Sequence, residues 1–426
     1  MRYWCEHAWL DESGVRSGVL VSTEDGRITE TSLVEAPPPD AHRLTGLVVP
    51  GFANAHSHAF HRALRGRTHA DGGTFWTWRT AMYSLASKLT PDGYRKLATA
   101  VYAEMALAGI TCVGEFHYLH HGAGGVPYAD PNEMAEALRT AAKDAGIRVT
   151  LLDTLYLTGG IETPLSAHQL RFSDGSVDAW ASRVSALRSD SVLLAGAAIH
   201  SVRAVPRPDI ARLVRAWPTG PLHVHLSEQP AENMACLNAY GLTPTELLAD
   251  EGVLSPRTTA VHATHLSIKD IQLLGDSSTW ACFCPTTEAD LADGIGPARE
   301  LVDAGSDLSL GSDQHAVADL LLEARALEYG ERLRTGQRGR FSPAELFSAM
   351  TAHSSLGWSD RYADLVAIRL DSPRTAGCLP GQAMLVASAA DVHTVVSSGR
   401  IIARDGLHQV GDVGRLLAEA IEELWQ

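Results

Sequence analysis

Histidine and carboxylate side chains close several short apolar runs of this chain. His56 and His58 flank one serine at the end of the first run, and His225, His262 and Asp313 close later ones. Alternate residues of a strand point to the same side, so His56 and His58 can face one cavity together. Imidazole and carboxylate groups are common ligands of catalytic divalent metals and common acid–base groups. Their types and spacing favour metal-assisted hydrolysis.

We expect His56, His58, His225 and Asp313 to hold one Zn²⁺-like ion and to leave room for a water molecule. Each feature alone is weak evidence. Two histidines one residue apart are usually solvated or hydrogen-bonded, and Asp313 alone would more often cap a helix. Together they favour a metal, because each group falls at the same end of a separately predicted strand.

Eight apolar, β-branched runs must position these groups, and helix-like stretches separate them. The runs cover Leu47–His58, Thr111–His121, Arg148–Leu157, Val192–Val202, Leu222–Glu228, Thr258–Leu266, Thr279–Thr287 and Asp307–His315. Near-continuous apolar strands that alternate with helices indicate a parallel sheet covered on both faces. Eight repeats favour a closed (β/α)₈ barrel with its active site at the carboxyl ends of the strands. An open doubly wound sheet would also alternate, but no glycine-rich GxGxxG turn follows an early strand.

Several intervening stretches carry helix signals. Thr90 and Pro91 supply an N-cap and a first-turn proline for a helix that runs to Ala108, and a second helix covers Pro131–Ala145. A glycine follows each of these two helices. Further candidate helices are Asp209–Trp217, Pro244–Glu251, Ser267–Leu274, Pro297–Ala304 and Asp319–Gly330.

The two ends of the chain have a different pattern, with short strand candidates separated by turns. Neither end is long enough for a robust core of its own. We therefore predict that residues 1–46 and 363–410 together form a small β-sandwich domain beside a catalytic barrel of residues 47–362. Residues 411–426 have acidic and apolar side chains at helical spacing and are predicted to form a C-terminal helix.

Composition excludes several classes of protein. The 426 residues include 35 basic and 50 acidic side chains, which gives a net charge of −15. The basic residues form no block, so nucleic acids and anionic membranes are disfavoured as partners. No apolar run approaches the length of a membrane span, and the start lacks a signal-peptide pattern. The six cysteines form no CxxC pair. We expect a cytoplasmic protein with free thiols.

Particular segments resemble a known superfamily. VVPGFANAHSHAF, HVHLSE, VHATHL and SLGSDQH resemble the amidohydrolase superfamily. FHRALRG, GTFWTWRTAMY, GEFHYLHH, IHSVRAV and CPTTEADLADGIG are closer to one of its families, the formimidoylglutamate deiminases. The resemblance runs from about residue 46 to the end of the predicted barrel, and the split terminal domain is consistent with it.

The resemblance implies the same four metal ligands and a mechanism. The superfamily's second metal usually needs a carboxylated lysine in the fourth strand, and VLLAGAAIHSV has none, so we expect a single ion, Zn²⁺ or Fe²⁺. Asp313 would also accept a proton from the attacking water. Glu228 would carry that proton to the leaving nitrogen, and His262 would orient the nucleophile or stabilise the tetrahedral intermediate.

The resemblance also implies a small anionic substrate, N-formimino-L-glutamate, which would be hydrolysed to N-formyl-L-glutamate and ammonia in histidine degradation. Arg79 and Arg203 are candidates for binding its carboxylates, because guanidinium binds carboxylate through two parallel hydrogen bonds. Tyr118 and His200 belong to the same family segments. His61 stands where the family usually has a glutamine that helps to bind substrate, so the exact acid stays open.

Two other functions remain. A related deaminase could act on another formimino amino acid or on a nucleobase-like amidine, although a neutral base needs no pair of arginines. A barrel that binds a ligand without turnover is a third possibility, against which stand the predicted ligands together with Glu228 and His262. A homodimer is expected from the general frequency of symmetric dimers alone.

Overall fold

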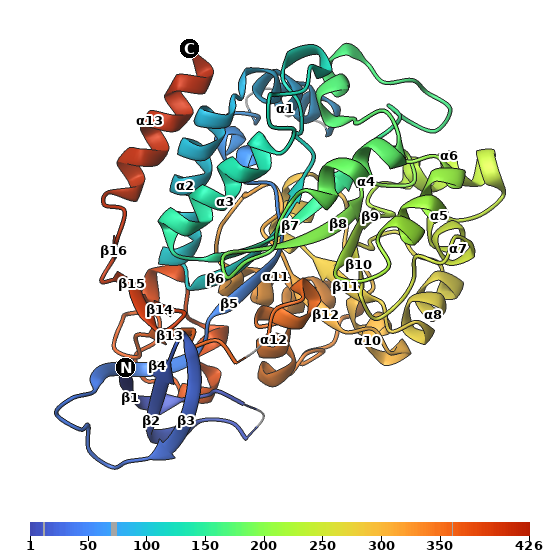
Figure 1. Cartoon of the computed structure of the whole chain (residues 1–426). Coiled ribbons are helices and arrows are strands. Elements are labelled where there is room, and N and C mark those ends of the chain that lie inside the picture. Colours follow the sequence, from blue (N-terminus) through green and yellow to red (C-terminus); the bar gives the residue numbers. More distant parts are fainter. Residues whose placement is uncertain (12, 70–74, 360) are drawn as a thin grey trace.

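A computed structural model describes residues 1–11, 13–69, 75–359 and 361–426, without the side chains of residues 75 and 76. Its strands form two eight-stranded sheets (Figure 1). One is a parallel sheet in sequence order from β5 to β12, and helices surround it. The other joins strands from both ends of the chain. The predicted fold class, a (β/α)₈ barrel with a separate β-structure from the termini, is confirmed.

Each barrel strand lies within a run predicted from sequence, or within one residue of it. The strands are β5 Phe52–Ser57, β6 Ile110–His117, β7 Arg148–Leu155, β8 Leu193–Ile199, β9 Leu222–Leu226, β10 Thr258–His262, β11 Trp280–Phe283 and β12 Leu308–Leu310. Almost every residue in them is buried, as expected for a sheet enclosed on both faces. A parallel bridge between Ser57 and Asp313 brings the two edge strands together and closes the barrel.

Helices follow most of the barrel strands and have recognisable starts. Thr90 accepts a hydrogen bond from the amide of Gly93 and caps α2, as predicted. Reciprocal capping boxes begin α7, α8 and α12. The helices are α1 Phe75–Lys88, α2 Pro91–Leu107, α3 Glu133–Ala145, α4 Val177–Ser185, α5 Arg207–Ala216, α6 Pro230–Tyr240, α7 Pro244–Asp250, α8 Ile268–Asp276, α9 Pro285–Asp290, α10 Ala298–Ala304, α11 Leu320–Thr335, α12 Pro343–Met350 and α13 Val413–Trp425, and the 3₁₀ segments are η1 Ala59–Leu64, η2 Ala123–Gly125, η3 Ala167–Phe172, η4 His353–Leu356, η5 Pro380–Leu385 and η6 Ala389–Asp391.

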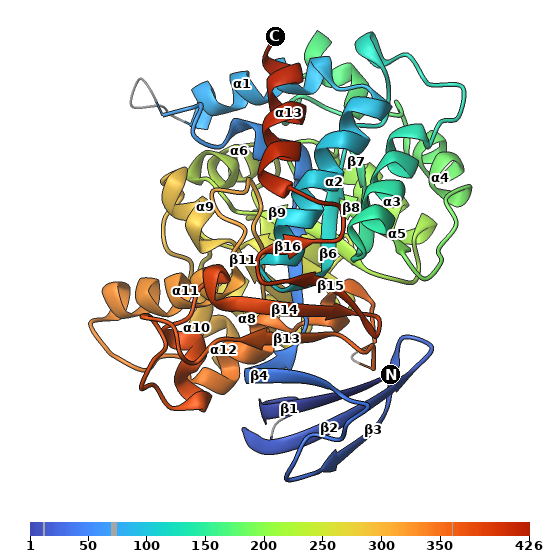
Figure 2. The same cartoon turned by 90° about the vertical axis from the view of Figure 1, so that its left-hand side faces the viewer.

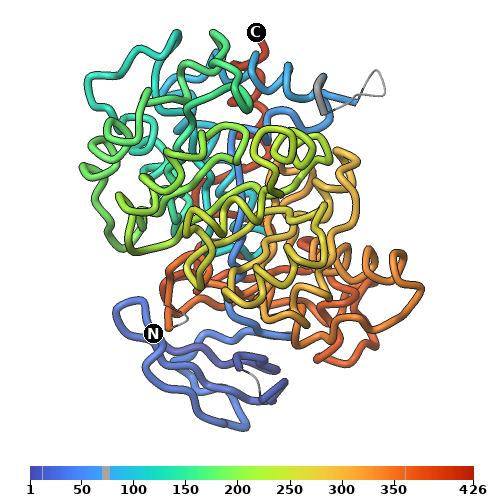
Figure 3. The backbone as a smooth tube through the Cα atoms, turned by 90° about the vertical axis from the view of Figure 1, so that its right-hand side faces the viewer, coloured from blue at the N-terminus to red at the C-terminus, as the bar shows by residue number. Residues whose placement is uncertain are grey.

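The terminal strands form the second sheet, in the order β16-β15-β14-β13-β4-β1-β2-β3. Where the sequence suggests two packed sheets, antiparallel pairing of β4 with β13 joins the two halves into one. One face carries a separate core that includes Tyr3, Val21 and Leu365. Figure 2 shows β1–β4 at the lower end of the molecule, with β13 to β16 stacked above them against the barrel, and Figure 3 shows the blue N-terminal segment at the same lower end. The strands are β1 Arg2–Ala8, β2 Arg16–Glu24, β3 Arg27–Leu33, β4 His42–Pro50, β13 Leu365–Ile368, β14 Val392–Ser397, β15 Arg400–Arg404 and β16 Leu407–His408.

A buried ion pair joins the terminal sheet to the barrel. Arg148, the first residue of β7, donates to both carboxylate oxygens of Asp364, which directly precedes β13. Asp364 also accepts hydrogen bonds from Thr111 and from the amide of Ser398. This junction lies at the amino end of β7, whereas a barrel of this kind places its chemistry at the carboxyl ends.

Helix α13 extends along the outside of the barrel beside α2 (Figures 1 and 2). Asp412 caps it by accepting from the amide of Arg415, and the indole of Trp425 donates to the carbonyl oxygen of Ala63. Across the described residues, no helix combines the length with the apolar character that crossing a bilayer requires.

Candidate active site

A pocket opens at the carboxyl ends of the barrel strands and has a volume of about 700 Å³ including its mouth. All the residues predicted from sequence for the site line it except His56, which is fully buried. The remaining lining is largely aromatic. The lining residues are His58, His61, Trp78, Arg79, Met82, Tyr83, Tyr118, Tyr156, Gly159, Phe172, His200, Arg203, Ala204, His225, Glu228, His262, Leu291 and Asp313. Distant parts of the sequence therefore meet as predicted.

Strand β5 and the end of β12 bring three of the predicted ligands together. The Nε2 atoms of His56 and His58 lie 3.3 and 3.4 Å from the same carboxylate oxygen, Oδ1 of Asp313. The ligand atoms of these three residues lie within 4.8 Å of one another, close enough to hold one metal ion.

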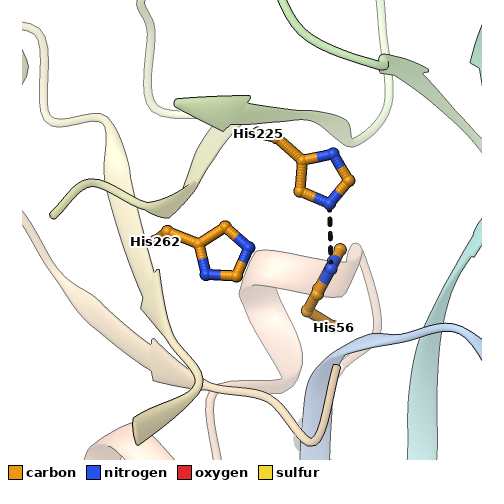
Figure 4. Close-up of side chains that lie close together, drawn as sticks. All are labelled: His56, His225 and His262. Atoms are coloured by element: carbon orange, nitrogen blue, oxygen red, sulfur yellow. Dashed lines mark hydrogen bonds between the residues drawn. The ribbon is translucent and has the colours of Figure 1, made fainter. Parts of the chain in front are cut away.

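His225 and His262 extend this group on the other side of His56. The Nε2 atoms of His225 and His56 are 3.2 Å apart, and their rings meet through these nitrogens (Figure 4). The rings of His225 and His262 are stacked 5.5 Å apart. The ligand atoms of His56, His225 and His262 also lie within 4.8 Å of one another.

Hydrogen bonds to backbone carbonyl groups set the proton positions of two of these rings. His58 Nδ1 lies 2.9 Å from the carbonyl oxygen of Phe116, and His225 Nδ1 lies 2.9 Å from that of His200. A carbonyl oxygen only accepts, so each Nδ1 carries the proton and each Nε2 presents a lone pair.

The inward-facing atoms form a set that suits a cation. Burial lowers the pKa of His58 to about 3 and lowers the pKa of His225 and His56 well below 6.5, which keeps these rings neutral. The lone pair of His58 Nε2 faces the Asp313 carboxylate 3.4 Å away with no proton between them. Neutral imidazoles and a carboxylate are the donor set that zinc prefers, so the residues fit a bound divalent ion.

Backbone strain is concentrated at the same strand ends. His262 and Asp313 have φ values of 71° and 42°, and Ser227, Ala263 and His315 also have positive φ. Residues other than glycine rarely adopt a positive φ. This backbone conformation costs of order 1–3 kcal/mol per residue. Strained residues of this kind cluster at active sites, where the surrounding structure holds particular side chains in fixed orientations.

Charged groups surround His262. Its Nε2 lies 3.9 Å from both Glu228 and Asp313, and its Nδ1 lies 3.4 Å from Glu288. Burial lowers the pKa of His262, but the Glu228, Glu288 and Asp313 carboxylates outweigh it and raise the pKa well above 6.5. Glu228 in turn lies 3.7 Å from a guanidinium nitrogen of Arg203. The site thus places a carboxylate between two cationic groups.

The predicted substrate-contacting residues occupy the outer part of the pocket. Arg79 projects from α1 and donates to the hydroxyl of Tyr83. Arg203 donates to Glu232 of α6 at 3.0 Å while its side chain keeps 24% exposure. His61 Nε2 lies 2.9 Å from the hydroxyl of Tyr118.

Sequence reasoning missed several buried acids that support the site. Glu115 accepts hydrogen bonds from Ser57 and from the amide of Ala59, and so holds the turn that carries His58. Burial raises the pKa of Glu115 to about 7. Burial, together with the Glu228 charge, raises the pKa of Asp293 to about 8. The sequence did offer a signal for Glu115, because an acidic residue inside an apolar run, as in GEFHY, is unusual unless it has a buried partner.

A second histidine cluster lies outside the pocket lining. His117, His120 and Asp153 could also hold a metal by proximity. Arg183, however, donates to both carboxylate oxygens of Asp153 at 2.7 and 2.8 Å, and so already supplies the positive charge. His120 and His121 are both buried.

A barrel that gathers imidazoles and carboxylates at the carboxyl ends of its strands defines a class of barrel hydrolases. The chain belongs to the amidohydrolase family, which residues 47–402 match. It is 35% identical to a formimidoylglutamate deiminase of Pseudomonas aeruginosa, over 95% of both chains. It is 30% identical to an 8-oxoguanine deaminase of the same organism, over 96% of this chain and 94% of the other. A crystal structure of an amidohydrolase from Brucella melitensis, 30% identical, superposes with a TM-score of 0.92 over the whole of both chains.

Proposed function

We propose that this protein hydrolyses N-formimino-L-glutamate to N-formyl-L-glutamate and ammonia. One observation carries the proposal: Arg79 and Arg203 line the same pocket as the histidine–aspartate group. An amidine that bears two carboxylates needs cationic partners in a chain of net charge −15. The 35% identity with a formimidoylglutamate deiminase supports the same substrate.

In this proposal His56, His58, His225 and Asp313 hold one divalent ion, with Zn²⁺ favoured over Fe²⁺. The lone pairs of His58 and His225 and the Asp313 carboxylate, described above, support this ligand set. When bound, the ion lowers the pKa of a water molecule and so supplies a nucleophile near neutral pH.

The chain's own residues then move the protons. Asp313 accepts a proton from the water that adds to the formimino carbon. Glu228, 3.7 Å from Arg203 and 3.9 Å from His262, takes up this proton and delivers it to the terminal imino nitrogen. The hydroxyl proton of the tetrahedral intermediate then follows the same route as the C=O bond forms. The bond from the carbon to the terminal nitrogen breaks, and that nitrogen leaves as ammonia. The pKa of His262 is raised well above 6.5 by the surrounding carboxylates, so its ring can donate a hydrogen bond to the oxygen of the tetrahedral intermediate.

Five side chains bind the substrate in this scheme. Arg79 and Arg203 pair with its carboxylates, and His61, Tyr118 and His200 shape the space between them and the reacting carbon. Because burial lowers the pKa of His61 and His200 well below 6.5, both rings are neutral and act as hydrogen-bonding groups. Histidine degradation, a cytoplasmic location and a homodimer stay predictions.

A nucleobase deaminase is the second candidate function. The 30% identity with an 8-oxoguanine deaminase favours it, and so do the flat aromatic walls of the pocket, among them Tyr118, Tyr156 and Phe172. A purine would stack on such walls but would leave two guanidinium groups without carboxylate partners.

Ammonia release by the zinc-loaded protein tests both candidates. The panel is N-formimino-L-glutamate, N-formimino-L-aspartate, 8-oxoguanine, guanine, cytosine and adenosine. The proposal expects turnover of the glutamate compound with kcat/KM at least a hundredfold above the others. Preference for the aspartate compound would overturn the substrate and keep the reaction. Turnover of a base alone would replace the proposal with the second candidate.

A further inference from the structure

A buried glutamine links two tyrosines on the wall of the pocket. Gln169, on η3, is 2% exposed. Its Nε2 lies 3.1 Å from the hydroxyl oxygen of Tyr83 and 2.8 Å from that of Tyr156. Its Oε1 accepts from the amide of Ser166 at 2.9 Å. Because a backbone N–H can only donate, the amide oxygen must face Ser166 and the amide N–H₂ must face the tyrosines.

This orientation determines what the tyrosine hydroxyls can do. The Tyr83 oxygen accepts from Gln169 and also from Arg79 Nε at 2.9 Å. Neither partner can take a proton back, so the O–H of Tyr83 has to donate elsewhere. The Tyr156 oxygen likewise accepts from Gln169. Among the residues that the structure describes, neither hydroxyl donates a hydrogen bond.

Both tyrosines belong to the pocket that contains the arginines. Tyr83 and Tyr156 line it together with Arg79 and Arg203. Burial raises the pKa of Tyr156 well above 10, so its hydroxyl keeps its proton. Two O–H donors beside a guanidinium form a site for an oxyanion, because carboxylate oxygens accept several charge-assisted hydrogen bonds at once.

We propose that Tyr83 and Tyr156 are substrate-binding residues that donate their hydroxyl protons to the carboxylate bound by Arg79, and that Gln169 is the positioning residue that aims both. This inference rests on the proposed function, because it assigns the contacts of one of the two substrate carboxylates. Through these contacts the pocket selects a dicarboxylate over an acid that lacks this group.

The test compares Tyr83→Phe and Tyr156→Phe with the unchanged protein on three substrates. These are N-formimino-L-glutamate and the two analogues that each lack one carboxylate, N-formimino-4-aminobutyrate and N-formimino-2-aminobutyrate. We expect each variant to raise KM for the dicarboxylate about tenfold, the usual effect of losing one hydrogen bond to a charged group, with kcat changed less than threefold. One of the two analogues lacks the carboxylate that Arg79, Tyr83 and Tyr156 bind. For that analogue, neither substitution should change KM.

Two further variants complete the test. Tyr329→Phe removes the hydroxyl of a half-exposed tyrosine on α11 and should leave all constants unchanged. Gln169→Glu replaces the donor amide with a carboxylate that accepts both hydroxyl protons, so KM for the dicarboxylate should rise at least as much as in either tyrosine variant. If Gln169→Glu does not fold, the tyrosine variants decide.

The outcomes separate this inference from the proposed function. If the unchanged protein does not turn over N-formimino-L-glutamate, the proposed function fails. If it does, and the tyrosine variants leave KM unchanged or raise it equally for both analogues, only the inference fails. A fall in kcat at constant KM would also overturn it.

Discussion

The backbone amide of His58 donates to the carbonyl oxygen of Asp313 at 3.1 Å. In return, the amides of Ser312 and Asp313 both donate to the carbonyl oxygen of His56 at 3.0 Å. Asn54 reinforces this contact by exchanging two hydrogen bonds with Ser312. The contact that closes the barrel therefore joins three of the four proposed ligands. These hydrogen bonds fix the relative positions of His56, His58 and Asp313.

Removing a proposed ligand should release the metal. We expect about one divalent ion per chain by elemental analysis and less in His225→Asn and Asp313→Asn after dialysis against a chelator, because losing one of the four ligands weakens metal affinity. Chelation of the unchanged protein should abolish ammonia release, and added Zn²⁺ should restore it. His42→Asn, an exposed histidine of β4, is the matched control. Full metal content in both ligand variants would disprove the assignment.

Glu228→Gln should lower kcat by about 10²–10⁴ while the metal stays bound, because the amide cannot deliver a proton to the leaving nitrogen. KM should change little. Glu251→Gln, at a surface ion pair with Arg207, serves as the comparison and should keep full activity. If Glu228→Gln kept its rate, the proton carrier would have to be sought elsewhere, with Asp293 the next candidate.

His61→Gln should preserve activity, with KM changed less than about threefold. A glutamine amide can donate to the Tyr118 hydroxyl or accept from it, so it can replace His61 Nε2, which lies 2.9 Å from that hydroxyl. His61→Ala removes this hydrogen-bond partner and should raise KM roughly tenfold, the usual cost of one lost buried hydrogen bond. Steady-state kinetics on N-formimino-L-glutamate measures both. A large loss in His61→Gln with an unaffected His61→Ala would contradict this role.

The Arg148–Asp364 pair should make the protein sensitive to acid. Burial alone raises the pKa of Asp364, but Arg148 and the hydrogen bonds outweigh it and hold the pKa below 3.8. The stabilisation is therefore fully present above pH 3.8 and is lost as the pH falls through the lower pKa of the folded protein. Asp364→Asn should lower the free energy of unfolding at pH 7 by on the order of 3 kcal/mol, because Arg148 stays buried without its partner.

Denaturant unfolding at pH 7 and pH 3 measures this effect. The difference between Asp364→Asn and the unchanged protein should shrink at the lower pH. The exposed ion pair of Arg2 and Asp40 supplies the control, because Asp40→Asn should leave the unfolding midpoint unchanged at both pH 7 and pH 3. Equal unfolding curves for Asp364→Asn and the unchanged protein at pH 7 would refute the prediction.

The barrel and the proposed ligands were predictable because local patterns encode them. The barrel strands are almost entirely buried and rich in apolar or β-branched residues, and a polar residue such as His225 or Asp313 at or just beyond a strand end stands out. In a barrel such ends converge whatever the sequence distance between them. The positions of these residues at the ends of three separate strands therefore predicted that they meet in one cavity.

The outer wall of the pocket was less predictable. Helix α1, which carries Arg79 and Tyr83, was not among the predicted helices, and its aromatic residues show no clear apolar stripe. Gln169 meets Tyr83 across 86 positions of the chain through an irregular segment. No periodicity encodes such a contact, because it depends on how separate loops stack above the barrel.

The pairing of β4 with β13 has a consequence for how the protein is made. Val48 pairs with Ala367, so one edge of β4 finds its neighbour only after more than three hundred further residues have left the ribosome. At typical rates of about 5–20 residues per second, that edge stays open for roughly 15 to 60 seconds. An open apolar strand edge is a template for another chain. Nascent copies on one messenger RNA therefore present the same open edge until the second half of the sheet is synthesised.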